Sequence, residues 1–375
     1  MNFPFLIVAL RFTPAMWQHM QSLYHCLKDM EINSTLLLGD EFSTYVEEKT
    51  NNQSITYAGP SRGPRALFEI VWSYIKLKKI CSKSKNVKYI LLVNWHPLNY
   101  FVLRLLKRRS PKVETILWLH EPHKGTLKNH GLKKYFAHRI ASFIQNSYFP
   151  HTDRFVLFSE QGLRLFNNEI APNLKHNYSV CKAPLFFRDL YNPIPTKKRK
   201  YITYFGLIAP IKRFDFFVFM AQNMPEYAFR LVTSGSVPGG LSSISNLDIV
   251  NKRILSDKEI VHFVSESLAC FALYKSGTNS GAVPVALMCG TPLLVSKIPA
   301  FENYGLKHKS NCVFVDRTDN IQQIKEAIEF IEANVEAMSA AARQSYLENF
   351  DDRNFAKYYT WLLEGQQLTV SEKHV

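Results

Sequence analysis

The chain has 375 residues, with 46 Lys and Arg against 31 Asp and Glu, and a formal net charge of +15 at pH 7. This length predicts two domains of ordinary size, and no stretch reaches about 18 uncharged apolar residues, which excludes a transmembrane helix. The six cysteines include no C-x-x-C pair, which excludes a disulfide framework or a zinc site and indicates reduced cysteines of a cytosolic protein.

The N-terminal half alternates strand patterns with helical patterns. Helical periodicity is found from Met16 to Met30 and from Arg65 to Lys79. The first apolar run is short and lacks a basic leader, so we interpret it as a strand and not as a signal peptide. The alternation predicts a parallel sheet covered by helices. The expected strands are residues 5–10, 35–38, 89–93, 115–119 and 154–158.

A candidate catalytic residue lies at the end of the fourth of these strands, in ILWLHEPHK. His120 follows the strand directly, and ligands of open parallel sheets collect beyond the carboxyl ends of strands. Glu121 beside it is a candidate polar contact or acid/base group, or it bonds the loop backbone. A lone histidine is often structural, and His19, near the first loop, could equally sit inside its helix.

The positive charge is concentrated in the N-terminal half. Residues 1–200 hold 30 Lys and Arg against 13 Asp and Glu, whereas residues 201–375 hold 16 against 18. Within residues 131–149, apolar side chains recur at helical spacing with basic side chains between them, and such a helix can lie on an anionic membrane surface. The candidate membrane or acceptor contacts are Lys133, Lys134 and Arg139.

Three explanations of this basic cluster compete. A solvated face without a partner is the ordinary explanation of a charge run. Binding to nucleic acid needs the same electrostatics, but the sequence has no recognisable reading motif or stacking platform, so we expect no nucleic-acid partner. We favour peripheral attachment to anionic lipid, with capture of a lipid-linked acceptor.

A boundary follows at YNPIPTKKRK, from Tyr191 to Lys200, which is rich in proline and charge and has the composition of a linker. We therefore expect an N-terminal domain over residues 1–195, a C-terminal domain over residues 196–350, and a final segment, residues 351–375, whose helix crosses back to the N-terminal domain. The expected strands of the second domain are residues 201–205, 229–232, 268–273, 293–295 and 312–315.

Two segments of the second half carry the strongest signal. In YFGLIAPIKRFDFF, from Tyr201, a strand leads through Gly206 into a loop with Lys212 and Arg213 and then into a helix. In SGTNSGAVPVALMCGTPLLV, from Ser276, a turn of small residues opens an apolar helix, where a phosphate can approach the backbone amides closely. The turn residues in the candidate donor-binding set are Gly277, Ser280, Gly281 and Ala282.

Together the two segments resemble the C-terminal domain of glycosyltransferase family 4. Members carry G-R-x-x-x-x-K-G and later two glutamates and A-M-A-x-G-x-P. Gly206, Lys212 and Asp215 match the first pattern, but the family arginine is Leu207 and the two glutamate positions are Gly277 and Val285. The matches to the second pattern are Ala286, Leu287, Met288, Gly290 and Pro292.

The resemblance implies an α/β protein with the GT-B fold, in which two Rossmann-like domains face a central cleft. It implies transfer of a sugar from a nucleotide-diphosphate donor to a glycan or lipid-linked glycan in polysaccharide biosynthesis, with retention of configuration. Lys212, Arg213 and the helix-end amides are suited to stabilise the leaving diphosphate. No D-x-D dyad is present, so we expect neither a metal nor a cofactor.

The expected location is the cytoplasm, at the inner face of the membrane. Two alternatives remain open. The absent glutamates are compatible with a GT-B scaffold that serves as a partner subunit, and an enzyme such as an epimerase uses a nucleotide sugar without a second sugar acceptor.

Overall fold

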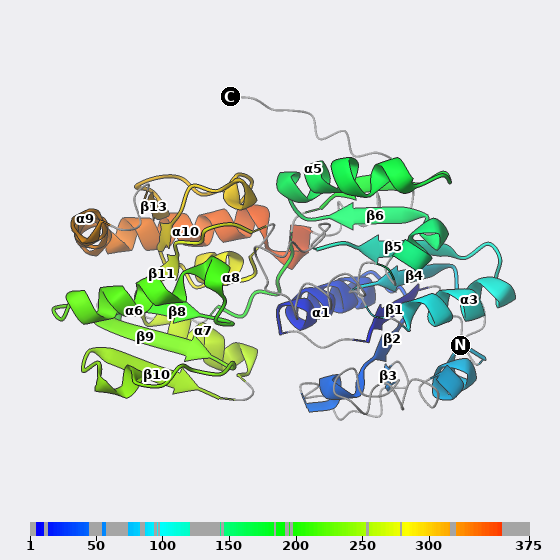
Figure 1. Ribbon diagram of the computed structural model, residues 1–375, viewed down its shortest axis with the longest axis horizontal. Helices are drawn as coiled ribbons and strands as arrows, with labels where there is room; N and C mark the ends of the chain where they lie inside the picture. Colours follow the sequence, from blue (N-terminus) through cyan, green and yellow to red (C-terminus); the bar gives the residue numbers. More distant parts are fainter. Residues whose placement is uncertain are drawn as a thin grey trace. The chain divides into compact units, whose positions relative to one another are not determined.

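The computed structural model of the chain divides into two compact units (Figure 1), with the described residues of the first lying within Met1–Ala183 and the second running from Pro184 to Asn354. The division precedes the expected linker, because residues 185–191 pack within the second unit. The residues that the structure describes are 5–10, 14–44, 55–57, 74–82, 87–93, 96, 98–120, 143, 146–183, 185–191, 195, 198–252, 255–277, 280–315 and 320–354.

The first unit contains a seven-stranded sheet in the order β3-β2-β1-β4-β5-β6-β7, in which every neighbouring pair is parallel. The interior strand β1 is buried along its whole length, as expected of a parallel sheet covered on both faces. The strands are β1 (Phe5–Ala9), β2 (Ser34–Leu38), β3 (Ile55–Tyr57), β4 (Tyr89–Leu92), β5 (Glu114–Trp118), β6 (Arg154–Leu157) and β7 (Ser179–Lys182).

Helices connect these strands. Ser159 caps one of them, because its hydroxyl accepts a hydrogen bond from the Gly162 amide at 2.9 Å. The described helices of the unit are α1 (Pro14–Asp29), α3 (Asn99–Arg109) and α5 (Glu160–Glu169), with short 3₁₀ turns η1 (Asp40–Thr44), η2 (Phe149–His151) and η3 (Ala171–Asn173) and a helical segment over residues 74–82.

The second unit contains a six-stranded parallel sheet in the order β10-β9-β8-β11-β12-β13. Its strands are β8 (Tyr201–Phe205), β9 (Ala228–Thr233), β10 (Leu247–Asn251), β11 (Ser267–Ala272), β12 (Leu293–Val295) and β13 (Cys312–Phe314). Its helices are α6 (Phe214–Asn223), α7 (Asp257–Ser265), α8 (Ala282–Met288), α9 (Ile321–Ala333) and α10 (Val335–Asn349), with turns η5 (Pro210–Lys212), η6 (Leu241–Ser243), η7 (Pro299–Phe301) and η8 (Asp352–Asn354).

Aromatic side chains form much of this unit's core. Phe217 of α6 lies 5.5 Å from Tyr204 of β8 and 5.4 Å from Phe271 of β11, between ring centroids. Helix α9 contributes Ile324 and Ile328 to the same buried cluster. Helices α6 and α9 are therefore held against the middle of the sheet by apolar burial.

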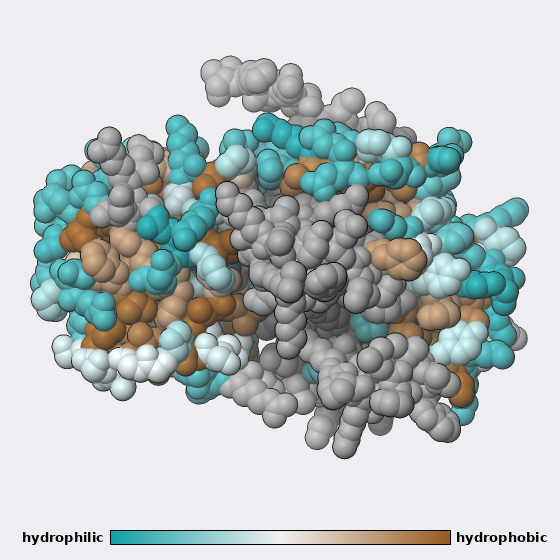
Figure 2. Space-filling view, in the orientation of Figure 1, coloured by the Kyte–Doolittle hydropathy of each residue, from teal (hydrophilic) through white to brown (hydrophobic). Residues whose placement is uncertain are grey.

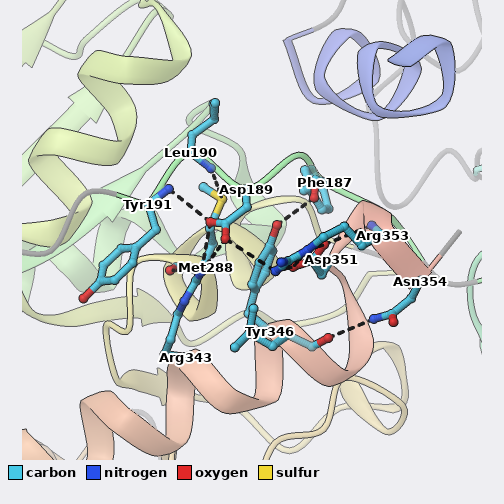
Figure 3. A network of polar contacts seen from close by, with 11 residues as sticks. Phe187, Asp189, Leu190, Tyr191, Met288, Arg343, Tyr346, Asp351, Arg353 and Asn354 are labelled. Carbon is cyan, nitrogen blue, oxygen red and sulfur yellow. Dashed lines mark hydrogen bonds and ion pairs between the residues drawn. The ribbon is translucent and has the colours of Figure 1, made fainter. Parts of the chain in front are cut away.

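A polar network joins the beginning and the end of the second unit (Figure 3). Asp189 forms an ion pair with Arg343 of α10, whose guanidinium also donates to the Met288 carbonyl at 2.9 Å. The Tyr346 hydroxyl donates to the Phe187 carbonyl at 2.6 Å, and Phe187 forms a parallel bridge with Asp351. The first and last segments of the unit are thus tied to each other.

The structure confirms every strand that the sequence predicts, to within a residue or two at the ends. It adds β3, β7 and β10. The expected helix over residues 65–79 is described only from residue 74, and the expected C-terminal helix lies outside the described residues beyond η8. Among the helices that the structure describes, none has the length and apolar character needed to cross a membrane.

Candidate functional site

The candidate donor site of the second unit lies where the connections of its sheet change direction. From β8 the chain builds β9 and β10 on one side, and then returns to build β11 to β13 on the other. Strands β8 and β11 are neighbours from which the chain continues in opposite directions, and such a switch point, at the carboxyl ends of the strands, is where open α/β sheets bind ligands.

Gly206 leaves the end of β8 in a conformation that only glycine adopts easily. Its φ is +106°, and its amide donates to the Val232 carbonyl at 2.9 Å. A Cβ at this position would lie 3.4 Å from the Lys212 amino nitrogen. That distance is an ordinary van der Waals contact, so the positive φ, and not a lack of space, is what favours glycine here.

Lys212 is the last residue of η5. Its amino nitrogen lies 5.6 Å from the ring centroid of Tyr274, which follows β11. The amide of Lys275 donates to the Ile211 carbonyl at 2.7 Å, which ties the loop after β8 to the segment after β11. The lysine forms no ion pair with a carboxylate of the described residues, so its charge stays uncompensated at this switch point.

Arg213 has a left-handed backbone, with a φ of +51°, and precedes α6. Its guanidinium carbon lies 4.7 Å from the centroid of the Phe216 ring. The buried Nε atom has no hydrogen-bond partner among the described residues. A strained backbone and an unsatisfied cation nitrogen in one residue are features that cluster at binding sites.

Two tyrosines that the sequence reasoning missed connect the two predicted segments. Tyr274 contacts Phe301, and Phe301 contacts Tyr304, each at 5.6 Å between ring centroids. The Tyr304 hydroxyl oxygen accepts a hydrogen bond from the Ser280 amide at 2.8 Å. Tyr274 could have been noticed because it follows a strand end, but nothing in the sequence distinguishes Tyr304 from an ordinary core aromatic.

The predicted helix-end amides are only partly available. The Ser280 amide is already bonded to Tyr304, and Pro284 in the first turn of α8 has no N–H. The amides of Gly281 and Ala282 remain as candidate donors. The Ser280 hydroxyl is buried without a partner among the described residues, while Gly277 is half-buried before the turn.

The positions that depart from the family pattern are apolar or exposed. Val285 is 3% exposed and packs in the core, so no carboxylate occupies that position of α8. Leu207, at the position of the family arginine, is 52% exposed, and hydrophobic residues are visible on the face of the unit that carries α6 (Figure 2). Asp215 is exposed in the first turn of α6.

In the first unit, His120 belongs to a cluster of rings at the carboxyl edge of the sheet. It stacks on Phe158, which follows β6, with 4.3 Å between ring centroids. His19 of α1 stacks on Trp118 of β5 at 4.1 Å and meets His120 edge-on at 5.8 Å. The structure therefore brings together the two histidines that the sequence singled out in this half.

Burial sets the charge of both histidines. It lowers the pKa of His120 to about 3. It also holds the pKa of His19 well below its usual range, and the neighbouring His120 lowers it further. Both imidazoles are consequently neutral at pH 7, and a neutral imidazole has one donor and one acceptor nitrogen.

Four predicted site residues, Glu121, Lys133, Lys134 and Arg139, lie outside the described residues. Within the described residues, no group of three or more His, Cys, Asp or Glu side chains is placed to hold a metal ion.

No protein family model matches the chain, and no curated protein matches it in sequence. Solved structures do match. HepE of Anabaena in complex with UDP is 13% identical, covering 98% of this chain and 100% of that chain with a TM-score of 0.66. Sucrose-phosphate synthase of Thermosynechococcus elongatus is 13% identical over 96% of this chain and 100% of its own, with a TM-score of 0.70.

A glycosyltransferase of Rickettsia africae matches similarly, at 13% identity over 97% of this chain and 100% of that chain, with a TM-score of 0.65. At these identities the likeness establishes the fold. The chain has the GT-B fold, with two Rossmann-like units built on parallel sheets.

Proposed function

We propose that the protein is a glycosyltransferase that moves a sugar from a nucleotide-diphosphate donor to a glycan or lipid-linked glycan in polysaccharide biosynthesis. The observation that carries this proposal is the amino group of Lys212, uncompensated by any described carboxylate, at the switch point beyond the carboxyl ends of β8 and β11. A fixed cation at that point suits a diphosphate.

The proposed chemistry follows from charge. Breaking the bond between sugar and diphosphate leaves negative charge on the leaving group, which Lys212, Arg213 and the Gly281 and Ala282 amides are suited to stabilise. With these groups in place the transfer needs no metal ion and no cofactor. Retention of configuration is the stereochemical course that we propose.

The fold neighbours support a nucleotide sugar as the donor. HepE is described with UDP and with UDP-glucose, and a trehalose-6-phosphate protein of Escherichia coli is described with UDP-2-fluoro glucose. We accordingly propose that the donor of this chain is a nucleoside diphosphate sugar of the same class.

His120 is proposed to orient the transferred sugar, with Glu121 as a neighbouring polar or acid/base group. His120 is neutral, stacks on Phe158 and lies beside His19, and a nitrogen of a neutral imidazole can form a hydrogen bond with a sugar hydroxyl. Because the ring is stacked in place, its direction is fixed before the sugar arrives.

Replacement of His120 by alanine tests this role. We expect turnover of the nucleotide sugar to fall by about 10²-fold or more, while affinity for the nucleoside diphosphate stays within error. The assay is release of nucleoside diphosphate with a lipid-linked glycan acceptor present. Replacement of the exposed His262 by alanine is the matched control, and wild-type turnover in the His120→Ala variant would reassign His120 to structure.

The proposal includes a location in the cell. We propose that the protein works in the cytoplasm at the inner face of the membrane, with Lys133, Lys134 and Arg139 among its contacts to lipid or acceptor. The net charge of +15 supports attraction to an anionic surface.

A second candidate function rests on the buried valine in α8. Because Val285 stands where family members carry a glutamate, the chain is also compatible with a GT-B scaffold that binds without turnover and acts as a partner subunit. Nucleotide binding without release of product from any donor sugar would favour this second function.

A further inference from the structure

A second positively charged feature lies in the first unit, at the amino ends of the strands, whereas His120 lies at their carboxyl ends. A hollow of about 460 Å³ is formed by α3 and η2. The turn η2 precedes β6, and α3 ends just before β5, so the hollow opens at the amino ends of these strands. Its lining residues are Tyr100, Leu103, Arg104, Lys107, Arg108 and His151.

The charges around this hollow are not balanced. Lys107 pairs with Asp153 at 3.0 Å, and the same carboxylate oxygen accepts a hydrogen bond from the Thr115 amide at 2.7 Å. The Asp153 carboxylate is therefore already engaged by Lys107 and by the Thr115 amide. The nearby Glu114 is likewise paired with Arg154 at 2.5 Å.

Arg104 and Arg108 have no such partner among the described residues, and both are exposed. They are four positions apart on α3, so they project from the same face one turn from each other, where like charges repel. Guanidinium groups bind phosphate oxygens in a bidentate manner, and an anion between the two would remove their repulsion.

His151 lies at the same hollow, with its ring centroid 6.1 Å from that of Tyr100. Partial burial lowers its pKa, as do Lys107, His176 and Arg104 in that order among the charged groups, while Asp153 opposes them. The lowered pKa of the imidazole thus reflects in part the positive charge around the hollow, and a bound anion will raise this pKa.

We propose that this hollow is a binding subsite for a phosphate group, held by Arg104, Arg108 and His151 and distinct from the donor site of the second unit. The apolar floor from Tyr100 and Leu103 gives the ligand a non-polar part to rest on (Figure 2 shows hydrophilic and hydrophobic residues side by side over α3). Both a phospholipid headgroup and a soluble phosphate ester present this chemistry.

The chain supplies a matched control on the other flank of α3. A second hollow of about 310 Å³ is lined by Lys78, Lys79 and Arg109 among others. Arg109 donates to the Ser82 carbonyl at 2.7 Å, so its guanidinium is engaged. The double variant Lys78→Gln with Lys79→Gln removes as much charge as Arg104→Gln with Arg108→Gln, from a hollow without a histidine.

The experiment follows the imidazole of His151 by NMR in the full-length protein, assigned with a His151→Gln variant. Inorganic phosphate is expected to raise the midpoint of the His151 titration relative to chloride at equal ionic strength. The Arg104→Gln/Arg108→Gln variant should lose this rise, and the Lys78→Gln/Lys79→Gln variant should keep it. Nucleoside diphosphate binding should be unchanged in both, which separates this test from the proposed function.

A second arm distinguishes the source of the phosphate by sedimentation with phosphatidylglycerol-containing vesicles. Loss of vesicle binding in the arginine variant alone supports a lipid headgroup, whereas a phosphate response with unchanged vesicle binding supports a soluble phosphate ester. Two results overturn the proposal. In the first, phosphate shifts the His151 titration midpoint no more than chloride does, and both double variants bind vesicles normally. In the second, the two double variants lose vesicle binding equally.

Discussion

Burial converts His19 from a titratable side chain into a neutral one. The residue is 2% exposed and its pKa in the folded protein lies well below the ordinary value, mainly because of desolvation. When the chain unfolds, the imidazole regains an ordinary pKa of about 6.5. As the pH falls below that value, only the unfolded state takes up the proton, so stability is lost toward acid pH.

We therefore predict that His19→Phe flattens the pH dependence of stability. Phenylalanine keeps the stack on Trp118 but cannot titrate, which removes up to about 1.4 kcal/mol per pH unit below pH 6.5. Thermal unfolding midpoints at pH 7.5 and 5.5 measure the effect. The midpoint should drop less in His19→Phe than in the wild type or in a His262→Gln control, and an equally steep drop would show that His19 titrates normally.

Single residues of the candidate donor site were predictable where they carry a distinctive type. Gly206, Lys212 and Arg213 were identified because they lie between a predicted strand and a predicted helix, and because Gly206 and Lys212 match the family pattern. Tyr274 and Tyr304 were not, since a sequence pattern cannot separate an aromatic residue at a site from one in a core. The hydrogen bond from the Ser280 amide to Tyr304 was likewise invisible in the sequence.

At the scale of elements, the ion pair between Asp189 and Arg343 fixes the first segment of the second unit to α10 (Figure 3). Arg343 also lies 4.6 Å from the ring of Tyr191 and 5.0 Å from that of Tyr346, measured to ring centroids. The guanidinium is thus surrounded by partners, and its removal leaves a carboxylate of Asp189 in a half-buried position with fewer partners.

Replacing Arg343 by methionine is expected to destabilise the second unit by about 1–3 kcal/mol, because a polar partner is lost at a partly buried site. Denaturant unfolding followed by far-ultraviolet circular dichroism measures the loss of unfolding free energy. Lys325→Ala, which breaks the more exposed pair with Glu226, is the control and should cost less than about 1 kcal/mol. Equal losses in the two variants would contradict a specific role for the network.

The strands that the sequence reasoning missed share a position in the fold. β3 and β7 form the two edges of the first sheet, and β10 forms one edge of the second. Edge strands are less buried, as the half-buried pattern of β7 shows, so their sequences lack the continuous apolar run that identified the central strands. The central strands, by contrast, were predicted because both of their faces are covered.

At the scale of the whole molecule, the prediction of a two-unit α/β protein with the GT-B fold is confirmed, with 13% identity to the fold neighbours. Alternation of apolar strands and amphipathic helices determines this architecture and survives when sequence identity is lost. The fold alone does not define a substrate, because one fold carries many chemistries. The proposed activity therefore depends on the candidate donor site at Lys212.

Thermal unfolding of the purified protein with UDP, GDP, ADP, CMP and TDP, in magnesium and in EDTA, tests that claim most directly. A ligand of the folded state at about 100 times its Kd stabilises it by about 2.7 kcal/mol. We predict that one nucleoside diphosphate raises the midpoint even in EDTA, and that Lys212→Ala abolishes the rise. Lys200→Ala, which removes a lysine over a tyrosine ring at the other end of β8, should keep it. No rise with any nucleotide, or the same rise in Lys212→Ala, would contradict a donor site at Lys212.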